Sequence, residues 1–138
     1  MKKVFADTDY WVAILNPHEQ LHPKAKSASA PLTNARVVTS EMVLTELLAF
    51  YSAKGERLRD GTVTLIERMR QNPNVTIIPQ TSAQFQEALA VYKQYRDKEW
   101  SLTDCASILI MREESITDAL SNDQHFEQAG FHSLLRDN

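Results

Sequence analysis

The sequence is poor in the residues and segments that mark secreted, disulfide-bonded or membrane-spanning proteins. Cys105 is its one cysteine, which excludes a disulfide within the chain and suits a reducing cytoplasm. No apolar run approaches the roughly 20 residues that a membrane-spanning helix needs, and no long apolar stretch follows Lys2 and Lys3 as in a secretory signal. We therefore expect a cytoplasmic protein with no membrane partner.

Positive charge is also in short supply. The chain carries 15 Lys and Arg against 18 Asp and Glu, a formal net charge of −3, which excludes a general electrostatic attraction to nucleic acid. An RNA or DNA partner would have to be held by a local patch or through metal ions. The length of 138 residues and the hydrophobic content of 43% predict one domain with a single core, residues 1–138.

Short apolar or β-branched segments alternate with segments suited to helices. Strands are expected at 4–6, 36–38, 75–78, 116–120 and 131–135, and helices at 10–15, 23–28, 41–53, 58–70, 82–95, 103–112 and 124–128. This alternation predicts an α/β fold whose parallel sheet is covered by helices on both faces. In the helix that starts at Ser82, apolar residues recur at helical spacing and are expected to face the core: Phe85, Ala88, Leu89, Tyr92 and Tyr95.

Two aspartates follow predicted strands. Asp7 comes directly after residues 4–6, and Asp123 comes soon after the strand that ends at Leu120. Ligands of parallel α/β proteins bind outside the carboxyl ends of the strands, so both carboxylates are well placed for chemistry. The structural alternative for Asp123 is the N-cap of the short helix at 124–128. Asp9 could belong to the edge of the same site or simply to the first turn of a helix.

Glu46 is surrounded by apolar residues if its segment is helical. Its neighbours three and four positions away are Met42, Val43, Ala49 and Phe50. A lone glutamate among them is costly to bury unless it is paired or binds a cation. The alternative is a place at the edge of the apolar stripe, where the carboxylate reaches solvent, and the sequence alone leaves both open.

Asp104 lies in the first turn of the helix at 103–112. Ser101 and Asp104 have the spacing of a capping box, and an aspartate in a first turn interacts favourably with the helix dipole, which alone would explain it. The helix is otherwise largely apolar, however. Its N-terminal end is therefore expected to enter the core near the edge of the sheet.

Together, these four acidic residues are more informative than any one of them. In a parallel α/β fold, Asp7, Asp104 and Asp123 could converge at one end of the sheet, with Glu46 reaching in from the side. Clustered carboxylates raise one another's pKa and cannot all ionise without cations. Mg²⁺ or Mn²⁺, which prefer oxygen ligands, would resolve that conflict.

A zinc metalloprotease pattern, H-E-x-x-H, is matched by residues 18–22. Zinc chemistry of that kind requires both histidines on one continuous helix. Pro17 and Pro23 flank the pentapeptide, so we expect a polar loop instead, with His22 at the entry to the helix at 23–28.

The order Asp7-Thr8-Asp9 is similar to the nucleophile motif D-x-D-x-T of haloacid-dehalogenase-type phosphatases. Trp11 stands where the threonine should be, and no later pair of adjacent aspartates completes that set. A partial motif is weak evidence, and a phosphatase is the lesser alternative.

Four stretches, taken in order, resemble the PIN domain, the fold of metal-dependent ribonucleases that includes the VapC toxins of bacterial toxin–antitoxin pairs. They are Val4-Phe5-Ala6-Asp7-Thr8, Thr45-Glu46-Leu47, Ser101-Leu102-Thr103-Asp104-Cys105-Ala106, and Ala119-Leu120-Ser121-Asn122-Asp123-Gln124-His125-Phe126 followed by Gly130-Phe131. The resemblance spans nearly the whole chain. It implies a three-layer α/β/α sandwich with a short, mainly parallel sheet, and an acidic quartet of Asp7, Glu46, Asp104 and Asp123.

The same resemblance implies an endoribonuclease that is the toxin component of a type II toxin–antitoxin pair. Its expected partners are an RNA substrate, an antitoxin that covers the site, and a second copy of the chain in a homodimer. His22 matches the family's usual entry to its second helix. Ser121 stands where threonine is common and keeps the hydroxyl, whereas Asp9 replaces a small polar residue and its role stays open.

The mechanism that we expect uses one or two Mg²⁺ or Mn²⁺ ions held by Asp7, Asp104 and Asp123, with Glu46 positioning or deprotonating the water that attacks an RNA phosphodiester. Thr8 and Ser121 would orient water or a phosphate oxygen. At the rim, the cationic side chains of Lys54, Arg57 and Arg59 are candidates to follow the RNA backbone. The alternative is an inactive PIN-like module that binds RNA or protein, although such a module has no need for clustered acids.

Overall fold

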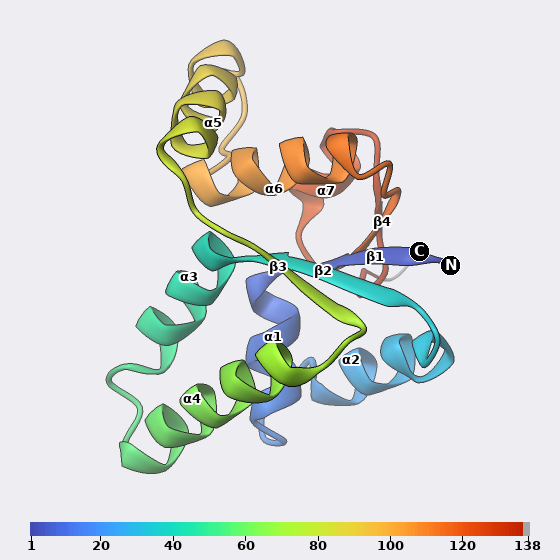
Figure 1. Ribbon diagram of the computed structural model, residues 1–138, viewed down its shortest axis with the longest axis vertical. Helices are drawn as coiled ribbons and strands as arrows, with labels where there is room; N and C mark the ends of the chain where they lie inside the picture. The colour runs from blue at the N-terminus through green and yellow to red at the C-terminus, as the bar shows by residue number, and fades with distance from the viewer. Residues whose placement is uncertain (137–138) are drawn as a thin grey trace.

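A five-stranded parallel sheet forms the centre of the molecule, which a computed structural model describes from residue 1 to residue 136 (Figure 1). The strands are β1 (Lys3–Ala6), β2 (Arg36–Ser40), β3 (Val75–Ile78), β4 (Asp118–Leu120) and β5 (His132–Ser133). Their order is β3-β2-β1-β4-β5, and every neighbouring pair is parallel. The chain therefore winds to one side from β1 through β3 and to the other side through β4 and β5. The winding changes side between β1 and β4.

Helices cover both faces of this sheet. On one face lie α1 (Thr8–Leu15), α2 (His22–Ser29), α3 (Glu41–Tyr51) and α4 (Glu56–Gln71), and on the other lie α5 (Ser82–Gln94), α6 (Leu102–Glu113) and α7 (Gln124–Gln128) (Figure 1). A 3-10 helix, η1 (Ala30–Leu32), follows α2. The predicted three-layer α/β/α sandwich is confirmed. No helix within residues 1–136 has both the length and the apolar character that crossing a bilayer requires.

Local sequence sets several helix ends near their predicted positions. The Ser40 hydroxyl accepts a hydrogen bond from the Val43 backbone N–H (3.2 Å) and so caps α3, as expected. Gly55, between α3 and α4, and Gly130, after α7, have φ angles of 97° and 92°, a left-handed backbone that glycine adopts without a steric penalty. Ser40 thus fixes the start of α3, Gly55 directly precedes α4, and Gly130 follows the end of α7. Both α3 and α7 border the carboxyl edge of the sheet.

The H-E-x-x-H segment does not form a zinc-binding helix. Residues 16–21 form turns, and α2 begins only at His22. The Nδ1 atom of His22 lies 2.7 Å from the carbonyl oxygen of Ala13. His18 and His22 therefore share no continuous helix, and the expected loop with His22 at the helix entry is confirmed.

The carboxyl end of β1 is held by buried polar contacts. The Thr39 hydroxyl donates to the carbonyl oxygen of Ala6 (2.9 Å) and accepts from Trp11 Nε1 (3.3 Å). The backbone N–H of Asp7 donates to the carbonyl oxygen of Leu120 (3.1 Å). Neighbouring strands on both sides thus fix the point at which β1 delivers Asp7.

The prediction that five apolar residues between 85 and 95 face the core is wrong for three of them. Phe85, Leu89 and Tyr92 are 39%, 43% and 53% exposed. α5 packs against α6 and lies beyond it, away from the sheet (Figure 1), so a narrow strip through Ala88 and Val91 is enough to bury its contact face. Tyr95, the fifth predicted residue, is half-buried against the core.

Candidate active site

Six carboxylates line one cavity at the carboxyl ends of β1 and β4. The cavity has a volume of about 550 Å³, and its acidic lining residues are Asp7, Asp9, Glu19, Glu46, Asp104 and Asp123. It lies where the winding of the sheet changes side, the usual place of a ligand in parallel α/β proteins. The structure therefore brings together all four acidic residues that the sequence singled out, and adds Asp9 and Glu19.

Asp7 is the most buried of these side chains, at 6% exposed. Its Oδ2 accepts a hydrogen bond from the Ser121 hydroxyl (3.0 Å). Burial and the nearby charge of Asp9 raise the pKa of Asp7 well above its usual value, against an opposing backbone hydrogen bond from Thr8. A bound cation would relieve both the cost of burying the Asp7 carboxylate and its repulsion by Asp9, so Asp7 is suited to act as a metal ligand.

Asp9 connects two parts of the site. Its Oδ2 accepts from the backbone N–H of Asn122 (2.7 Å) and lies 3.4 Å from the Ser121 hydroxyl, which ties the start of α1 to the connection between β4 and α7. Its Oδ1 is buried and has no hydrogen-bond partner within the described part of the chain. Burial raises the pKa of Asp9 to about 6; the Asn122 hydrogen bond opposes this rise and the charge of Asp123 adds to it. Asp9 thus leaves one carboxylate oxygen available to a cation.

The two predicted supporting hydroxyls contact carboxylates. The Thr8 hydroxyl donates to Glu46 Oε1 (2.6 Å). The Ser121 hydroxyl donates to Asp7 and accepts from the backbone N–H of Asp123 (3.0 Å). Each hydroxyl therefore joins residues that are far apart in sequence; the predicted action on water or phosphate stays a prediction.

Glu46 lies at the edge of the apolar stripe of α3. Met42, Val43 and Leu47 are buried on that helix, whereas Glu46 is half-buried and Phe50 is exposed beside it. Both Glu46 and Phe50 line the cavity. The carboxylate therefore reaches solvent at the edge of the apolar stripe and also faces the candidate site. A position in contact with solvent and a functional role are thus compatible for Glu46.

Asp104 uses its two oxygens differently. Its Oδ2 accepts from the backbone N–H of Ser101 (2.8 Å), and the Ser101 hydroxyl accepts from the backbone N–H of Asp104 (3.1 Å), which completes the predicted capping box. Its Oδ1 lies 3.0 Å from Nε2 of His125. Capping a helix and lining the cavity are therefore compatible in this residue.

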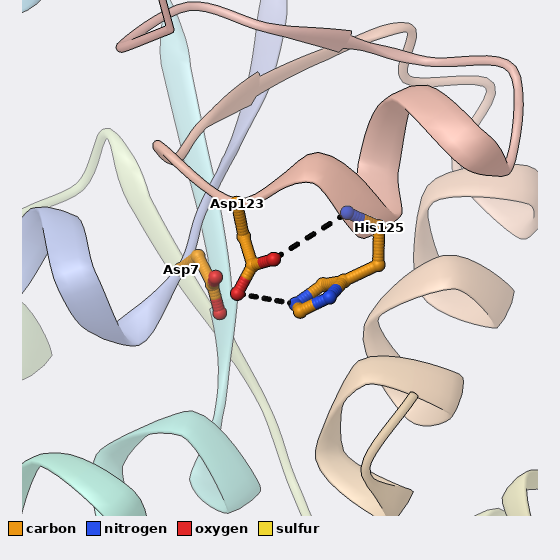
Figure 2. Close-up of side chains that lie close together, drawn as sticks. All are labelled: Asp7, Asp123 and His125. Atoms are coloured by element: carbon orange, nitrogen blue, oxygen red, sulfur yellow. Dashed lines mark hydrogen bonds and ion pairs between the residues drawn. The ribbon is translucent and has the colours of Figure 1, made fainter. Parts of the chain in front are cut away.

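His125 is a residue of the site to which sequence reasoning gave no role. Its Nε2 lies 2.6 Å from Oδ2 of Asp123, which also caps α7 through Oδ1 (Figure 2). Burial disfavours the charged imidazole, but hydrogen bonds and charge interactions with Asp104 and Asp123 outweigh burial and raise its pKa to about 10. Burial would likewise raise the pKa of Asp123, yet the contacts with His125 lower it. The sequence feature that could have pointed to His125 is its position in the first turn of α7, two residues after the candidate ligand Asp123.

The donor set fits a divalent cation. One atom each of Asp7, Asp123 and His125 lies within 4.8 Å of the other two, with Asp123 in the middle (Figure 2). The raised pKa of His125 keeps its imidazole protonated in the metal-free protein, so the donors at neutral pH are the carboxylates, and the imidazole nitrogen would bind a metal only after losing its proton. The buried Asp7 carboxylate and the partnerless Oδ1 of Asp9 add negative oxygen donors. Carboxylate oxygens suit Mg²⁺ and Mn²⁺, so the residues present agree with the predicted class of metal.

A family model for the PIN domain matches residues 4–132. The chain belongs to the PIN domain family. This confirms the resemblance stated from the sequence, including the predicted fold, and decides against the phosphatase alternative.

One curated relative and two solved structures match nearly the whole of this PIN domain. This chain is 28% identical over 130 residues to the 23S rRNA-specific endonuclease VapC20 of Mycobacterium tuberculosis, a match that covers 93% of this chain and 95% of the relative. The crystal structure of VapC20, described as a Sarcin-Ricin loop cleaving toxin, aligns with a TM-score of 0.81 at 26% identity over 93% of this chain and 95% of that chain. The crystal structure of FitAcB from Neisseria gonorrhoeae aligns with a TM-score of 0.64 at 18% identity over 94% and 95%, a likeness of fold.

Proposed function

We propose that this PIN domain is a divalent-metal-dependent endoribonuclease that acts through Asp7, Glu46, Asp104 and Asp123. Family membership and the relationship to the VapC20 endonuclease confirm the predicted class of function, an endoribonuclease of the toxin type. Within the structure, the observation that carries the assignment of these residues is their convergence on one cavity from β1, α3, α6 and the start of α7.

Mg²⁺ or Mn²⁺ is the cofactor that we propose, held by Asp7, Asp104 and Asp123 with Glu46. When bound, the metal would stabilise negative charge on the attacking and leaving oxygens of an in-line displacement at phosphorus. Glu46, half-buried at the rim, is placed to orient a water molecule and accept its proton, and the hydrogen bond from Thr8 fixes the direction of its carboxylate.

The partners that we propose are an RNA substrate and a protein antitoxin, with action in the cytoplasm. Homodimerisation and the single-domain organisation of residues 1–138 stay predictions, which light scattering and limited proteolysis would check. At the rim, Lys54 Nζ lies 4.9 Å from the ring centroid of Phe50, which lines the cavity, and this supports its predicted place near the RNA.

Metal-dependent cleavage of RNA by matched variants tests the proposal. We expect Glu46→Gln to lower kcat on a ribosomal RNA fragment by about 10²-fold or more, the usual effect of removing a general base, and EDTA to abolish cleavage by the wild type. Glu56→Gln, which removes an exposed carboxylate from the first turn of α4, is the control and should keep wild-type activity. Equal cleavage with and without EDTA, or by wild type and Glu46→Gln, would overturn the proposal.

A further inference from the structure

A second cavity lies beside the acidic one and shares a wall with it. It has a volume of about 670 Å³ and is built from the end of α5, the segment that leads to α6, and the first turn of α6. Ser101 lines both cavities, while its neighbours in that turn divide between them, Asp104 facing the first and Cys105 the second. An extended ligand could therefore pass from one cavity to the other across Ser101.

The charge of this second cavity is opposite to that of the active site. Its lining includes three cationic side chains, Lys93, Arg96 and Lys98, and one acidic side chain, Glu99. Lys98 is paired with Asp97 (2.9 Å), so Lys93 and Arg96, both exposed, provide most of the positive field. In a chain with a net charge of −3, this local patch is the kind of surface that a polyanion would need. We call the cavity the basic groove.

Aromatic side chains stand among these cations. Tyr95 and Trp100 lie with ring centroids 4.9 Å apart, and Trp100 Nε1 donates to Gln128 Oε1 (2.9 Å), which fixes this part of the wall. Tyr92 is 53% exposed although the spacing of α5 predicted it to be buried. Tyr92 is therefore the exposed ring of this cavity, because Trp100 is buried and Tyr95 is half-buried. Positive charge beside an exposed ring is a pattern by which proteins bind single-stranded nucleic acid, since phosphates meet the cations and a base stacks on the ring.

We propose that the basic groove binds the single-stranded RNA that flanks the scissile phosphate. The inference rests on the proposed endoribonuclease function and deepens it by naming the residues that hold the strand beside the cleavage site. The strand in the groove is unpaired, because a base must be unstacked from its neighbours to lie on Tyr92. Lys93 and Arg96 hold phosphates, and the strand crosses Ser101 to bring the next phosphate to the acidic cavity. The acidic cavity repels RNA on its own, so the groove supplies the attraction there.

RNA binding measured in EDTA tests this inference without any cleavage. The probe is a fluorescein-labelled single-stranded oligoribonucleotide, and the readout is fluorescence anisotropy over a series of salt concentrations. We expect Lys93→Ala/Arg96→Ala to raise Kd by roughly 10-fold or more at low salt and to reduce the slope of log Kd against log salt by about 0.7 for each phosphate that no longer meets a cation. The control Lys26→Ala/Arg68→Ala removes two exposed charges that line neither cavity and should bind as the wild type does.

Two further variants separate stacking from other roles of Tyr92. Tyr92→Ala should weaken binding by roughly 10-fold, while Tyr92→Phe, which keeps the ring, should restore it; duplex RNA of the same sequence should bind more weakly. Wild-type Kd values for the groove variants would overturn the inference, as would a change of oligomeric mass in Tyr92→Ala with unchanged RNA affinity. If the wild type binds RNA but cleaves none in Mg²⁺ or Mn²⁺, the proposed function fails and the groove stands.

Discussion

At the scale of single residues, the acidic side chains of the site divide their oxygens between structure and chemistry. Asp104 caps α6 through Oδ2 and contacts His125 through Oδ1. Asp9 holds the Asn122 backbone through Oδ2 and leaves Oδ1 without a partner among residues 1–136. A carboxylate that is needed for local structure can therefore still serve a metal, because each of its two oxygens can meet a different group.

Asp9→Asn should stabilise the metal-free protein at neutral pH. The rise of the Asp9 pKa from 3.8 to about 6 corresponds to about 3 kcal/mol, and part of the gain is offset because the new amide nitrogen has no partner, so we expect about 1–2 kcal/mol. The gain should vanish near pH 4, where Asp9 is already protonated, and Mn²⁺ should bind more weakly at neutral pH. Urea unfolding at both pH values and calorimetric titration with Mn²⁺ measure these effects.

Asp60→Asn, which removes an exposed carboxylate from α4, is the control for that comparison. If Asp9→Asn lost stability equally at both pH values, Asp9 would act only as a hydrogen-bond anchor for the connection before α7.

At the scale of elements, two helix starts allow capping to be separated from catalysis. The Thr81 hydroxyl caps α5 by accepting from the backbone N–H of Gln84 (3.0 Å), away from the site. We expect Thr81→Ala to cost about 1 kcal/mol of stability with no change in cleavage. In Asp104→Asn the amide oxygen can still accept from Ser101, so the capping box should survive and the loss of stability should be limited to the lost ion pair with His125, while metal-dependent cleavage falls by about 100-fold or more.

Thermal unfolding and RNA cleavage, measured on Thr81→Ala and Asp104→Asn, show whether Asp104 serves catalysis as well as helix capping. A large loss of stability with retained cleavage in Asp104→Asn would mean that the capping box alone explains the residue.

The sequence was a good guide to elements whose burial comes from the sheet. The β-branched segment Val75–Ile78 is a strand over the predicted residues, and the short helix Gln124–Gln128 also has its predicted bounds. α5 was different, because helical spacing reports a possible apolar face but not which neighbour covers it, and α6 covers only part of that face. Phe85, Leu89 and Tyr92 therefore remained exposed.

The candidate site was predictable in part, for a related reason. Residues that follow strands or open helices have positions that topology constrains, so the sequence pattern alone could bring Asp7, Asp104 and Asp123 together. The contact between His125 and Asp104 depends on how α7 packs beside α6, which no local pattern records. Asp9 was noticed, but its buried free oxygen depends on the three-dimensional path of the connection after β4.

At the scale of the whole molecule, the metal-free protein should lose stability as pH rises. The folded-state pKa values of Asp7 and Asp9 are raised, so the contribution of these residues to the free energy of unfolding is fully present below about pH 3.8. The contribution of Asp9 is lost as the pH rises through about 6. His125 acts in the same direction: its contribution is complete below about pH 6.5 and is lost through about pH 10. Asp123 has a lowered pKa and opposes this trend only under more acidic conditions, below about pH 3.8.

Thermal unfolding in EDTA should therefore give a Tm that falls between about pH 4 and pH 7. Saturating Mn²⁺ should raise Tm more at neutral than at acidic pH, because it binds the ionised carboxylates of the folded state; an excess of about 100-fold over Kd contributes about 2.7 kcal/mol. A metal effect that is the same at both pH values would contradict this linkage.

The most direct measurement is the rate at which Asp7→Asn cleaves RNA in Mg²⁺ or Mn²⁺. The substitution keeps the size of a buried side chain whose carboxylate has a raised pKa, so the variant should fold and be at least as stable as the metal-free wild type. We predict that it cleaves at less than about one hundredth of the wild-type rate and binds Mn²⁺ more weakly. A folded Asp7→Asn protein that cleaves RNA at the wild-type rate would contradict the assignment of this acidic cavity as the nuclease site.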